Sequence, residues 1–361
     1  MELFRKKARG ELIPKIKSFR SGSVPRLMVW AEPFRKAYWD ANFVHITGGL
    51  CPLPCKVEYD RRKINTTDAI LIAVRETKDR ETVTKSLSPR DPNQPWIGLA
   101  FNPPNMANAI FKTKFRHYNQ LFNRTMTYRR DADIVFLHGF IASKEDAKLL
   151  PRTWVIPPKM KIKNDSRKLA VAFISNCNAM SKRLLYSQKF QKYAPLDIYG
   201  RCGNLKCGGS MYVIHRYNAT EDQCLQIAGE GYLFYFAFEN NFCKDYISEK
   251  AYNLLHYSIV PVVRGSANYS SVLPPNSYID ANNYSPKELA DRLLYLQAHP
   301  QEYRKYLGWK KYFQPSTVGG AMVLCHLCTR LYDPDFYEYK LYEDFDDWFV
   351  EKSHCLAGLD F

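Results

Sequence analysis

The stretch that decides the fold covers residues 232–263 and reads YLFYFAFENNFCKDYISEKAYNLLHYSIVPVV. In it, an apolar run is followed by a polar loop, a helical pattern over residues 248–257 and a second apolar run. This order predicts a β-strand, a helix and a second strand parallel to the first. The junction between loop and helix carries Tyr246, Glu249 and Lys250. Free N–H groups and a positive dipole at a helix N-terminus favour phosphate, so this junction is a candidate nucleotide site.

The alternation of strand and helix patterns continues on both sides of this unit. Strand patterns occupy residues 169–174, 196–199, 232–238, 259–263 and 278–280. Helical patterns occupy residues 181–193, 221–228, 248–257, 286–298, 301–312 and 319–331. Strands that alternate with helices predict a mainly parallel sheet with helices on both faces. Earlier apolar runs predict the buried strands of another sheet, at residues 27–30, 69–74, 96–101 and 134–137.

The length of 361 residues exceeds the size at which one core keeps growing, so two α/β domains are expected. A proline pair at residues 157–158 disfavours helix and strand and marks a linker. We therefore predict a basic tail or stem remnant at residues 1–26, an N-terminal domain at 27–156, a linker at 157–168, a C-terminal domain at 169–335 and a C-terminal tail at 336–361.

Residues 238–250, which read FENNFCKDYISEK, resemble the donor-site signature of the α-1,3-fucosyltransferase family together with PVVRG at residues 261–265. Further matching segments are residues 175–178 with Arg183, then 197–200, 267–269, 274–275 and 285–290. The resemblance thus covers most of residues 170–332. It implies a GT-B-like α/β fold, in which two Rossmann-like domains face each other across a cleft.

Members of this family transfer L-fucose from GDP-fucose to glycans. The resemblance implies transfer from GDP-β-L-fucose to a GlcNAc residue of a glycan or glycoprotein, in α-1,3 linkage and with inversion. It makes the N-terminal domain the acceptor side and the C-terminal domain the GDP-fucose-binding side, and it requires no metal or other cofactor. The acceptor stays open between the core GlcNAc of an N-glycan and an outer N-acetyllactosamine.

Five residues are the candidates for the donor site. By resemblance, Arg183 and Lys250 hold the pyrophosphate, on which negative charge develops as GDP leaves. A guanidinium suits this task because it grips phosphate oxygens in a bidentate way. Glu249 is expected to accept hydrogen bonds from the ribose hydroxyls. Asn240, at the end of a predicted strand, and Tyr246 are expected to contact the donor.

The catalytic base is where the chain departs from the family pattern. The family places a glutamate in a context that resembles WIGLAFNPP at residues 96–104, and here that position is Asn102. An amide cannot serve as a general base near neutral pH. Three explanations stay open: another carboxylate acts, with Glu239 the first to test although it is also a candidate structural carboxylate; the alignment shifts; or activity is impaired.

Other functions also stay open. The chain could be a weak or inactive family member that binds GDP-fucose, another GT-B nucleotide-sugar transferase, or a glycan- or polyanion-binding protein without a donor site. The formal net charge of +16 indicates attraction to anions. Nucleic acid is not an expected partner, since the chain has no aromatic RNA-binding signature and no zinc-finger spacing.

The ten cysteines and several N-x-S/T sequons favour the secretory pathway. Close cysteine pairs predict disulfides; the pairs are Cys51/Cys55, Cys202/Cys207 and Cys325/Cys328. The first and third pairs could each bridge locally, or they could cross-link the N-terminal region to the C-terminal helix. A zinc site would instead need the first and third pairs to converge as four thiolates. The sequons are at Asn65, Asn123, Asn164, Asn218, Asn268 and Asn283.

Family resemblance implies a Golgi luminal enzyme held as a type II membrane protein. The basic N-terminus leads into no apolar run long enough to span a membrane, so the anchor is not visible in this sequence. Either the chain is a catalytic region without its anchor or it reaches its compartment differently. No metal site is expected, because the acidic pairs lack the setting of a strand end; these pairs are Asp131/Asp133, Asp333/Asp335 and Asp346/Asp347.

Overall fold

The computed structural model describes residues 1–11, 19, 22, 24–31, 49–74, 85, 90–106, 114–155, 166–208, 222–316 and 319–357. The chain forms two compact units. The first consists of Met1–Leu137 and Val318–Cys355, and the second consists of His138–Thr317 and Leu356–Phe361. The domain boundaries inferred from the sequence stay a prediction, and most of the predicted linker at 157–168 lies outside the described residues.

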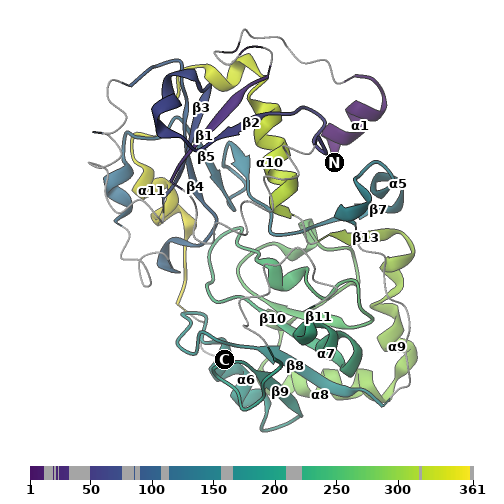
Figure 1. Ribbon diagram of the computed structural model, residues 1–361. Helices are drawn as coiled ribbons and strands as arrows, with labels where there is room; N and C mark the ends of the chain where they lie inside the picture. The colour runs from purple at the N-terminus through teal and green to yellow at the C-terminus, as the bar shows by residue number, and fades with distance from the viewer. Residues whose placement is uncertain are drawn as a thin grey trace. The chain divides into compact units, whose positions relative to one another are not determined.

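The first unit contains a sheet of six parallel strands in the order β2-β1-β3-β4-β5-β6 (Figure 1). The strands are β1 (Arg26–Ala31), β2 (Lys56–Glu58), β3 (Ala69–Ala73), β4 (Trp96–Ala100), β5 (Arg124–Thr127) and β6 (Ile134–Val135). Its helices are α1 (Glu2–Ala8), α10 (Gly319–Arg330), which contacts β6, and α11 (Phe345–Phe349). All residues of β3 and β4 are buried, as their continuous apolar sequences predict. The four strands predicted for this sheet are confirmed as β1, β3, β4 and β6.

The second unit contains five parallel strands in the order β12-β11-β10-β8-β9. The strands are β8 (Lys168–Phe173), β9 (Leu196–Tyr199), β10 (Tyr232–Phe238), β11 (Val260–Arg264) and β12 (Ile279–Asp280). The helices are α6 (Arg183–Phe190), α7 (Gln223–Gly231), α8 (Pro286–Ala298) and α9 (Pro300–Lys305). An antiparallel pair, β7 (Phe140–Ser143) with β13 (Phe313–Ser316), and the short α5 (Lys144–Ala147) complete the unit.

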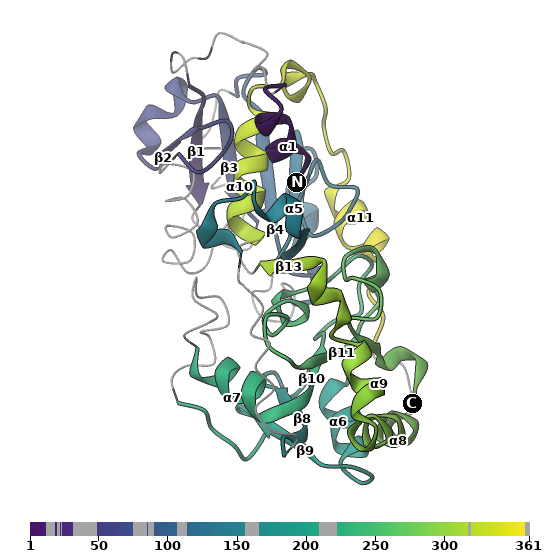
Figure 2. The same cartoon turned by 90° about the vertical axis from the view of Figure 1, so that its right-hand side faces the viewer.

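Helices cover both faces of this second sheet, as the alternating patterns predict. Figure 2 shows α7 on one side of β8, and α6 and α8 on the other. Phe190 of α6 and Leu293 of α8 pack into one apolar core, whereas Leu225 of α7 packs into the core on the opposite face. The predicted α/β class with parallel sheets is therefore confirmed.

The predicted helix over residues 248–257 is wrong. The segment forms a 3₁₀ turn, Glu249–Ala251, followed by hydrogen-bonded turns. Tertiary packing decides its path: a Cβ at Gly139 would lie 2.4 Å from the ring of Tyr252, and one at Gly229 would lie 2.1 Å from the ring of Tyr257. These two glycines admit the tyrosine rings against the backbone, and the resulting contacts outweigh local helical propensity.

Four disulfides join eight of the cysteines, and the other two, Cys243 and Cys355, are also disulfide-bonded. The bonds are Cys51–Cys325, Cys55–Cys328, Cys177–Cys202 and Cys207–Cys224. The prediction of disulfides is confirmed. Of the alternatives left open, cross-links between the N-terminal region and the C-terminal helix are the ones observed, and these four cysteines form neither local bridges nor a zinc site. Cys202 and Cys207 bond Cys177 and Cys224 and not each other.

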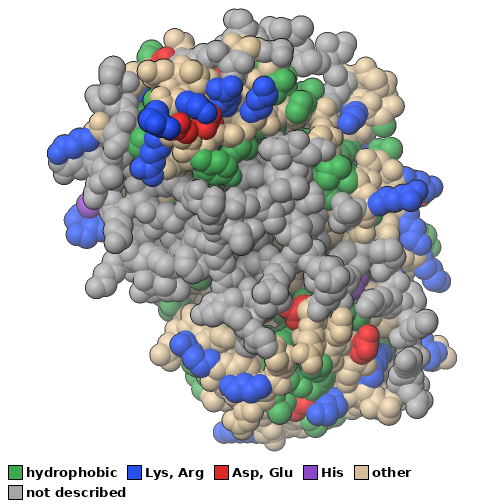
Figure 3. All heavy atoms as spheres, in the orientation of Figure 1, with side chains coloured by type: hydrophobic (Ala, Val, Ile, Leu, Met, Phe, Trp, Pro, Cys, Tyr) green, Lys and Arg blue, Asp and Glu red, His purple; other side chains and the backbone are tan. Residues whose placement is uncertain are grey.

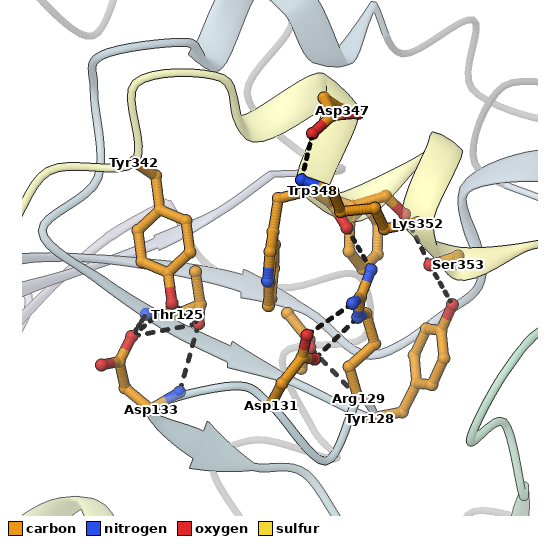
Figure 4. A network of polar contacts seen from close by, with 12 residues as sticks. Thr125, Tyr128, Arg129, Asp131, Asp133, Tyr342, Asp347, Trp348, Lys352 and Ser353 are labelled. Atoms are coloured by element: carbon orange, nitrogen blue, oxygen red, sulfur yellow. Dashed lines mark hydrogen bonds and ion pairs between the residues drawn. The ribbon is translucent and has the colours of Figure 1, made fainter.

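Residues 336–361, predicted as a tail, contain α11 and buried aromatic side chains at Phe336, Phe345 and Phe349. Figure 4 shows polar contacts that hold residues 342–353 in the first unit. Arg129 stacks on Trp348, with the guanidinium carbon 4.7 Å from the ring centroid, and donates a hydrogen bond to its carbonyl oxygen. Residues 336–355 thus belong to the core of the first unit, and the spacing of their aromatic side chains is the sequence signal for this.

The acidic pair Asp131 and Asp133 belongs to the same network. Asp131 pairs with Arg129 at 2.5 Å, and Asp133 accepts hydrogen bonds from the Thr125 amide and the Tyr342 hydroxyl at 2.9 and 2.8 Å (Figure 4). Both carboxylates therefore serve the fold. Among the described residues, no group of three or more His, Cys, Asp or Glu side chains is arranged to hold a metal ion.

The surface offers two further observations. Figure 3 shows one face, on whose described part the Lys and Arg side chains occur in several separate places. Asn123, the acceptor residue of one sequon, is buried. Its side-chain Oδ1 accepts a hydrogen bond from the Trp96 amide at 3.0 Å, and its Nδ2 donates to the Lys340 carbonyl at 2.8 Å. In the folded chain this sequon is therefore not a glycan acceptor. Among the described helices, none combines the length and apolar character needed to cross a bilayer.

A buried cation holds the end of the segment that follows the 3₁₀ turn Glu249–Ala251. Lys310, in the 3₁₀ turn Gly308–Lys311, donates hydrogen bonds to the carbonyl oxygens of Leu255 and Tyr257, the latter at 2.6 Å. Burial lowers the pKa of its ammonium group to about 7. Lys310 thus ties these two carbonyls to the turn Gly308–Lys311.

We expect Lys310 to make the free energy of unfolding rise with pH above neutrality. An unfolded lysine keeps its proton to a pKa of about 10.4, whereas the folded side chain releases it at about 7. Between these values the unfolded state binds the extra proton, so stability increases by up to ~1.4 kcal/mol per pH unit. Urea unfolding of the wild type and of Lys310→Gln, whose neutral amide still donates, measures the slope. Equal slopes in the two proteins would contradict this assignment.

Candidate functional site

The candidate site lies at the carboxyl ends of the central strands of the second sheet. The chain passes from β8 to β9 on one side and then crosses to β10 on the other side of β8. In open parallel sheets such a switch in direction leaves a crevice beyond the strand ends, and ligands bind there. Arg183 follows β8 in the chain, and Glu239 and Asn240 follow β10 directly.

Arg183 opens helix α6 and is 5% exposed. Its Nη1 donates a hydrogen bond to the Phe238 carbonyl at 3.0 Å. Burial lowers the pKa of its guanidinium, and the negative charge of Glu239 acts in the opposite direction. Among the described residues, its buried Nε has no hydrogen-bond partner. The side chain therefore brings a fixed positive charge with unused donor capacity to the end of β10.

Lys250 lies in the turn Glu249–Ala251, and its side chain is 15% exposed. Its Nζ donates to Ser248 Oγ at 2.7 Å and to Glu249 Oε1 at 3.1 Å, and lies 3.6 Å from Glu239 Oε2. Glu239 is fully buried, and its carboxylate accepts hydrogen bonds from the Ser248 amide at 2.8 Å and the Ser248 hydroxyl at 2.7 Å. These contacts are those of a structural carboxylate, which is one of the two roles that the sequence left open for Glu239.

Glu249 and Tyr246 lie near a histidine that the sequence analysis did not single out. His138 Nδ1 is 3.9 Å from Glu249 Oε2, and its ring meets the ring of Tyr246 edge to face at 6.4 Å. Tyr246 is buried, at 2% exposure, whereas the Glu249 side chain keeps 14% of its surface. No sequence spacing identifies His138 as a site residue. The glycine that follows it, Gly139, is the available signal, because it lets the Tyr252 ring pack directly against the backbone at this point.

Asn240 and Arg264 hold the loop that precedes α6. The carbonyl of Asn240 accepts a hydrogen bond from the Ser181 amide at 3.2 Å, and Arg264 Nη1 donates to the Ser181 carbonyl at 3.0 Å. Arg264 is buried between the rings of Tyr186 and Phe242, at 4.8 and 4.7 Å. Burial lowers the pKa of its guanidinium to about 10. In the sequence, Arg264 is one residue of the motif at 261–265. In the structure it supports the loop that leads into α6 and thereby Arg183, the first residue of that helix.

Asn102 lies in the first unit, directly beyond β4 and Phe101, and is partly exposed. It thus follows the carboxyl end of a parallel strand, as the sequence context predicts for the family's base. Its side chain is an amide, and the role of this position stays a prediction.

A doubly wound parallel sheet with two cationic side chains near its switch point is an arrangement typical of nucleotide-binding α/β proteins. A family model described as glycosyltransferase family 10 (fucosyltransferase), C-terminal part, matches residues 163–348, and a model of the fucosyltransferase N-terminal part matches residues 23–139. The chain therefore belongs to glycosyltransferase family 10, the fucosyltransferases.

Similar proteins agree with this membership. α-(1,3)-Fucosyltransferase C of Drosophila melanogaster is 33% identical over 289 residues, which cover 75% of this chain and 63% of that protein. The human 4-galactosyl-N-acetylglucosaminide 3-α-L-fucosyltransferase FUT6 is 28% identical, with 91% of this chain and 85% of that protein covered. The chain thus spans about two thirds of the length of the Drosophila relative.

Solved structures support the fold. A crystal structure of an α1,3-fucosyltransferase matches with a TM-score of 0.52 at 15% identity, covering 81% of this chain and 84% of that chain. The same fold appears in a crystal structure of α1,3-fucosyltransferase with GDP, with a TM-score of 0.51 and 14% identity.

Proposed function

We propose that the protein transfers L-fucose from GDP-β-L-fucose to a GlcNAc residue of a glycan or glycoprotein, in α-1,3 linkage and with inversion. The observation that carries the proposal is the pair of cations, Arg183 and Lys250, at the switch point of the second sheet. Family membership supports it, and so does the similar fold of a crystal structure of an α1,3-fucosyltransferase with GDP-fucose.

In this proposal Arg183 and Lys250 hold the pyrophosphate and offset the charge that develops on it as GDP leaves. Glu249 accepts hydrogen bonds from the ribose hydroxyls, and Asn240 and Tyr246 make further donor contacts. No metal is needed, because the two side chains supply the positive charge. The acceptor is a core GlcNAc or an outer N-acetyllactosamine. We place the enzyme in the Golgi lumen, since its disulfides favour an oxidising compartment.

A mass-spectrometric transfer assay with GDP-fucose and a panel of GlcNAc-containing acceptors tests the proposal. We expect the mass increment of one deoxyhexose on at least one acceptor. GDP binding without transfer would instead support a weak or inactive family member, the alternative motivated by Asn102. Thermal stabilisation by another nucleoside diphosphate and not by GDP would support a different nucleotide-sugar transferase.

We expect Asn102→Glu to raise the rate of fucose transfer by about tenfold or more, because a positioned carboxylate accepts the hydroxyl proton and general-base help is worth about 10²–10⁴-fold. Asn102→Gln is the matched control, since it lengthens the side chain without adding a charge. The transfer rate with saturating donor and acceptor is the measurement. A wild type that already turns over at ~1–10 s⁻¹, with no gain in Asn102→Glu, would show that the base lies elsewhere.

We infer that Glu239 is a poor candidate for that base. Its side chain is fully buried and both of its oxygens accept hydrogen bonds from the Ser248 hydroxyl. A general base must reach the hydroxyl that it deprotonates, directly or through one water. Glu239 instead accepts hydrogen bonds from Ser248 and lies 3.6 Å from the Lys250 ammonium.

A further inference from the structure

Ser248 lies between the buried carboxylate Glu239 and the candidate phosphate ligand Lys250. Ser248 and Glu239 are both 0% exposed. The distance from Ser248 Oγ is 2.7 Å to Glu239 Oε2 and 2.7 Å to Lys250 Nζ. The same Oγ caps the backbone amide of Lys250 at 3.5 Å. One hydroxyl thus touches the carboxylate, the ammonium and the start of the turn.

The direction of each hydrogen bond follows from the groups involved. An ammonium group has only donors, so Ser248 Oγ accepts from Lys250 Nζ. The Ser248 hydroxyl has one proton, and the Lys250 amide and ammonium both donate to its oxygen, so that proton goes to Glu239. The carboxylate of Glu239 thus accepts hydrogen bonds from both the amide and the hydroxyl of Ser248. The result is a directed chain from Lys250 through Ser248 to Glu239.

This chain also fixes where Lys250 can bind a ligand. Of its three N–H groups, one goes to Ser248 and one to Glu249. In the described part of the protein, the third N–H group has no acceptor within hydrogen-bond distance; its nearest charged neighbour is Glu239 Oε2, 3.6 Å from Nζ, and the side chain is 15% exposed. Because two donors are committed, the direction of the third is set by the protein and not by the ligand.

We propose that Ser248 and Glu239 are positioning residues that act through Lys250. They orient its ammonium toward the pyrophosphate of the donor before the donor arrives, and the buried charge of Glu239 holds the ammonium in place. This inference rests on the proposed function, since it takes a nucleoside diphosphate as the ligand. It adds that the binding energy of Lys250 depends on a hydroxyl that does not itself contact the ligand.

A double-mutant cycle tests the proposal by calorimetric binding of GDP and of guanosine, which lacks the phosphates. The proteins are wild type, Ser248→Ala, Lys250→Ala, the double variant, and Glu239→Gln, whose amide competes with Lys250 for the serine oxygen. Ser277→Ala is the matched control, because Ser277 is a buried serine of the same unit outside this chain of contacts.

We expect Ser248→Ala to weaken GDP binding about tenfold, the loss associated with one hydrogen bond to a charged group, and to leave guanosine binding within about twofold. In the Lys250→Ala background, Ser248→Ala should have no further effect on GDP, since there is no ammonium left to orient. Glu239→Gln should behave as Ser248→Ala does, and Ser277→Ala as the wild type.

Three results would overturn the proposal: an unchanged GDP affinity in Ser248→Ala, an equal loss for GDP and guanosine, or the same loss with and without Lys250. If one variant does not fold, the other still completes the cycle, because each interrupts the same chain of contacts. A wild type that does not bind GDP would instead remove the proposed function, and this inference with it. If the wild type binds GDP but the losses in affinity of Ser248→Ala and Lys250→Ala add up in the double variant, only this inference is overturned, and the proposed function stands.

Discussion

A variant that lacks both Cys51–Cys325 and Cys55–Cys328 is expected not to fold stably, although a variant that lacks either one alone should fold. The two bonds join residues 274 and 273 positions apart in sequence, both within the first unit. In the chain-entropy model, closing a loop of this length removes more than about 5 kcal/mol of unfolded-state entropy at 25 °C. That is comparable to the whole stability of a domain.

Removal of one bond has a smaller effect because the other still closes nearly the same loop. Once one bond is present, the other restricts only the few residues between neighbouring cysteines, and in the same model it adds about 2 kcal/mol to the free energy of unfolding. The effects of the two single removals should therefore add to far less than the effect of removing both. This non-additivity follows from the connectivity alone.

Urea unfolding followed by circular dichroism measures these effects, with Cys51→Ala/Cys325→Ala, Cys55→Ala/Cys328→Ala and the variant with all four substitutions. The control removes Cys177–Cys202, which closes a separation of 25 residues in the second unit. Comparable unfolding midpoints for the four-substitution variant and the wild type would refute the expectation. Peptide mapping without reductant should also recover these two bonds intact from native protein.

Replacement of Lys250 or Arg183 by Ala is expected to weaken GDP binding by about 2–3 kcal/mol, the scale of a charge-assisted hydrogen bond to phosphate. Both cations belong to the second unit and lie near the buried charge of Glu239. Lys244→Ala is the matched control, because Lys244 is an exposed lysine of the same loop and its removal changes the net charge equally.

Calorimetric titration with GDP at fixed ionic strength measures the difference, with thermal unfolding to show that each variant folds. The control should bind as the wild type does. If neither Lys250→Ala nor Arg183→Ala alters the affinity, the donor pyrophosphate is not held at this strand end, and the roles given to both residues are wrong.

The sequence predicts the sheets well because their strands are buried on both faces. The apolar runs at residues 69–74 and 232–238 have no polar alternation, and β3 and β10 are indeed fully buried. The place of one candidate residue was predictable for a similar reason: Asn240 was expected at the end of a strand and follows β10 closely, whereas its contact with the donor stays a prediction. Ligand-binding side chains in parallel sheets follow the ends of strands, and a strand end can be located from the sequence alone.

The rest depends on contacts between residues far apart in the chain. The path of residues 248–257 is decided by Gly139, Gly229 and Lys310, which no local pattern connects to it. The disulfide partners of Cys51 and Cys55 could not be selected by spacing, since several pairings satisfy the same sequence. The contact of Ser248 with Glu239 likewise needs the strand end and the turn to be placed in space.

The order in which the first unit is completed also bears on how the chain is made. Its strands come from the first 137 residues, whereas α10 and α11 are supplied by residues 318–355. At a synthesis rate of about 5–20 residues per second, the ribosome needs roughly 15–55 s to pass from Cys51 to Cys325. During that interval Cys51 and Cys55 have emerged without their native partners and are exposed to premature oxidation with each other. The two native bonds therefore cannot form until the C-terminal helix has been made, and any earlier bond between Cys51 and Cys55 has to be reopened by thiol–disulfide exchange before they do.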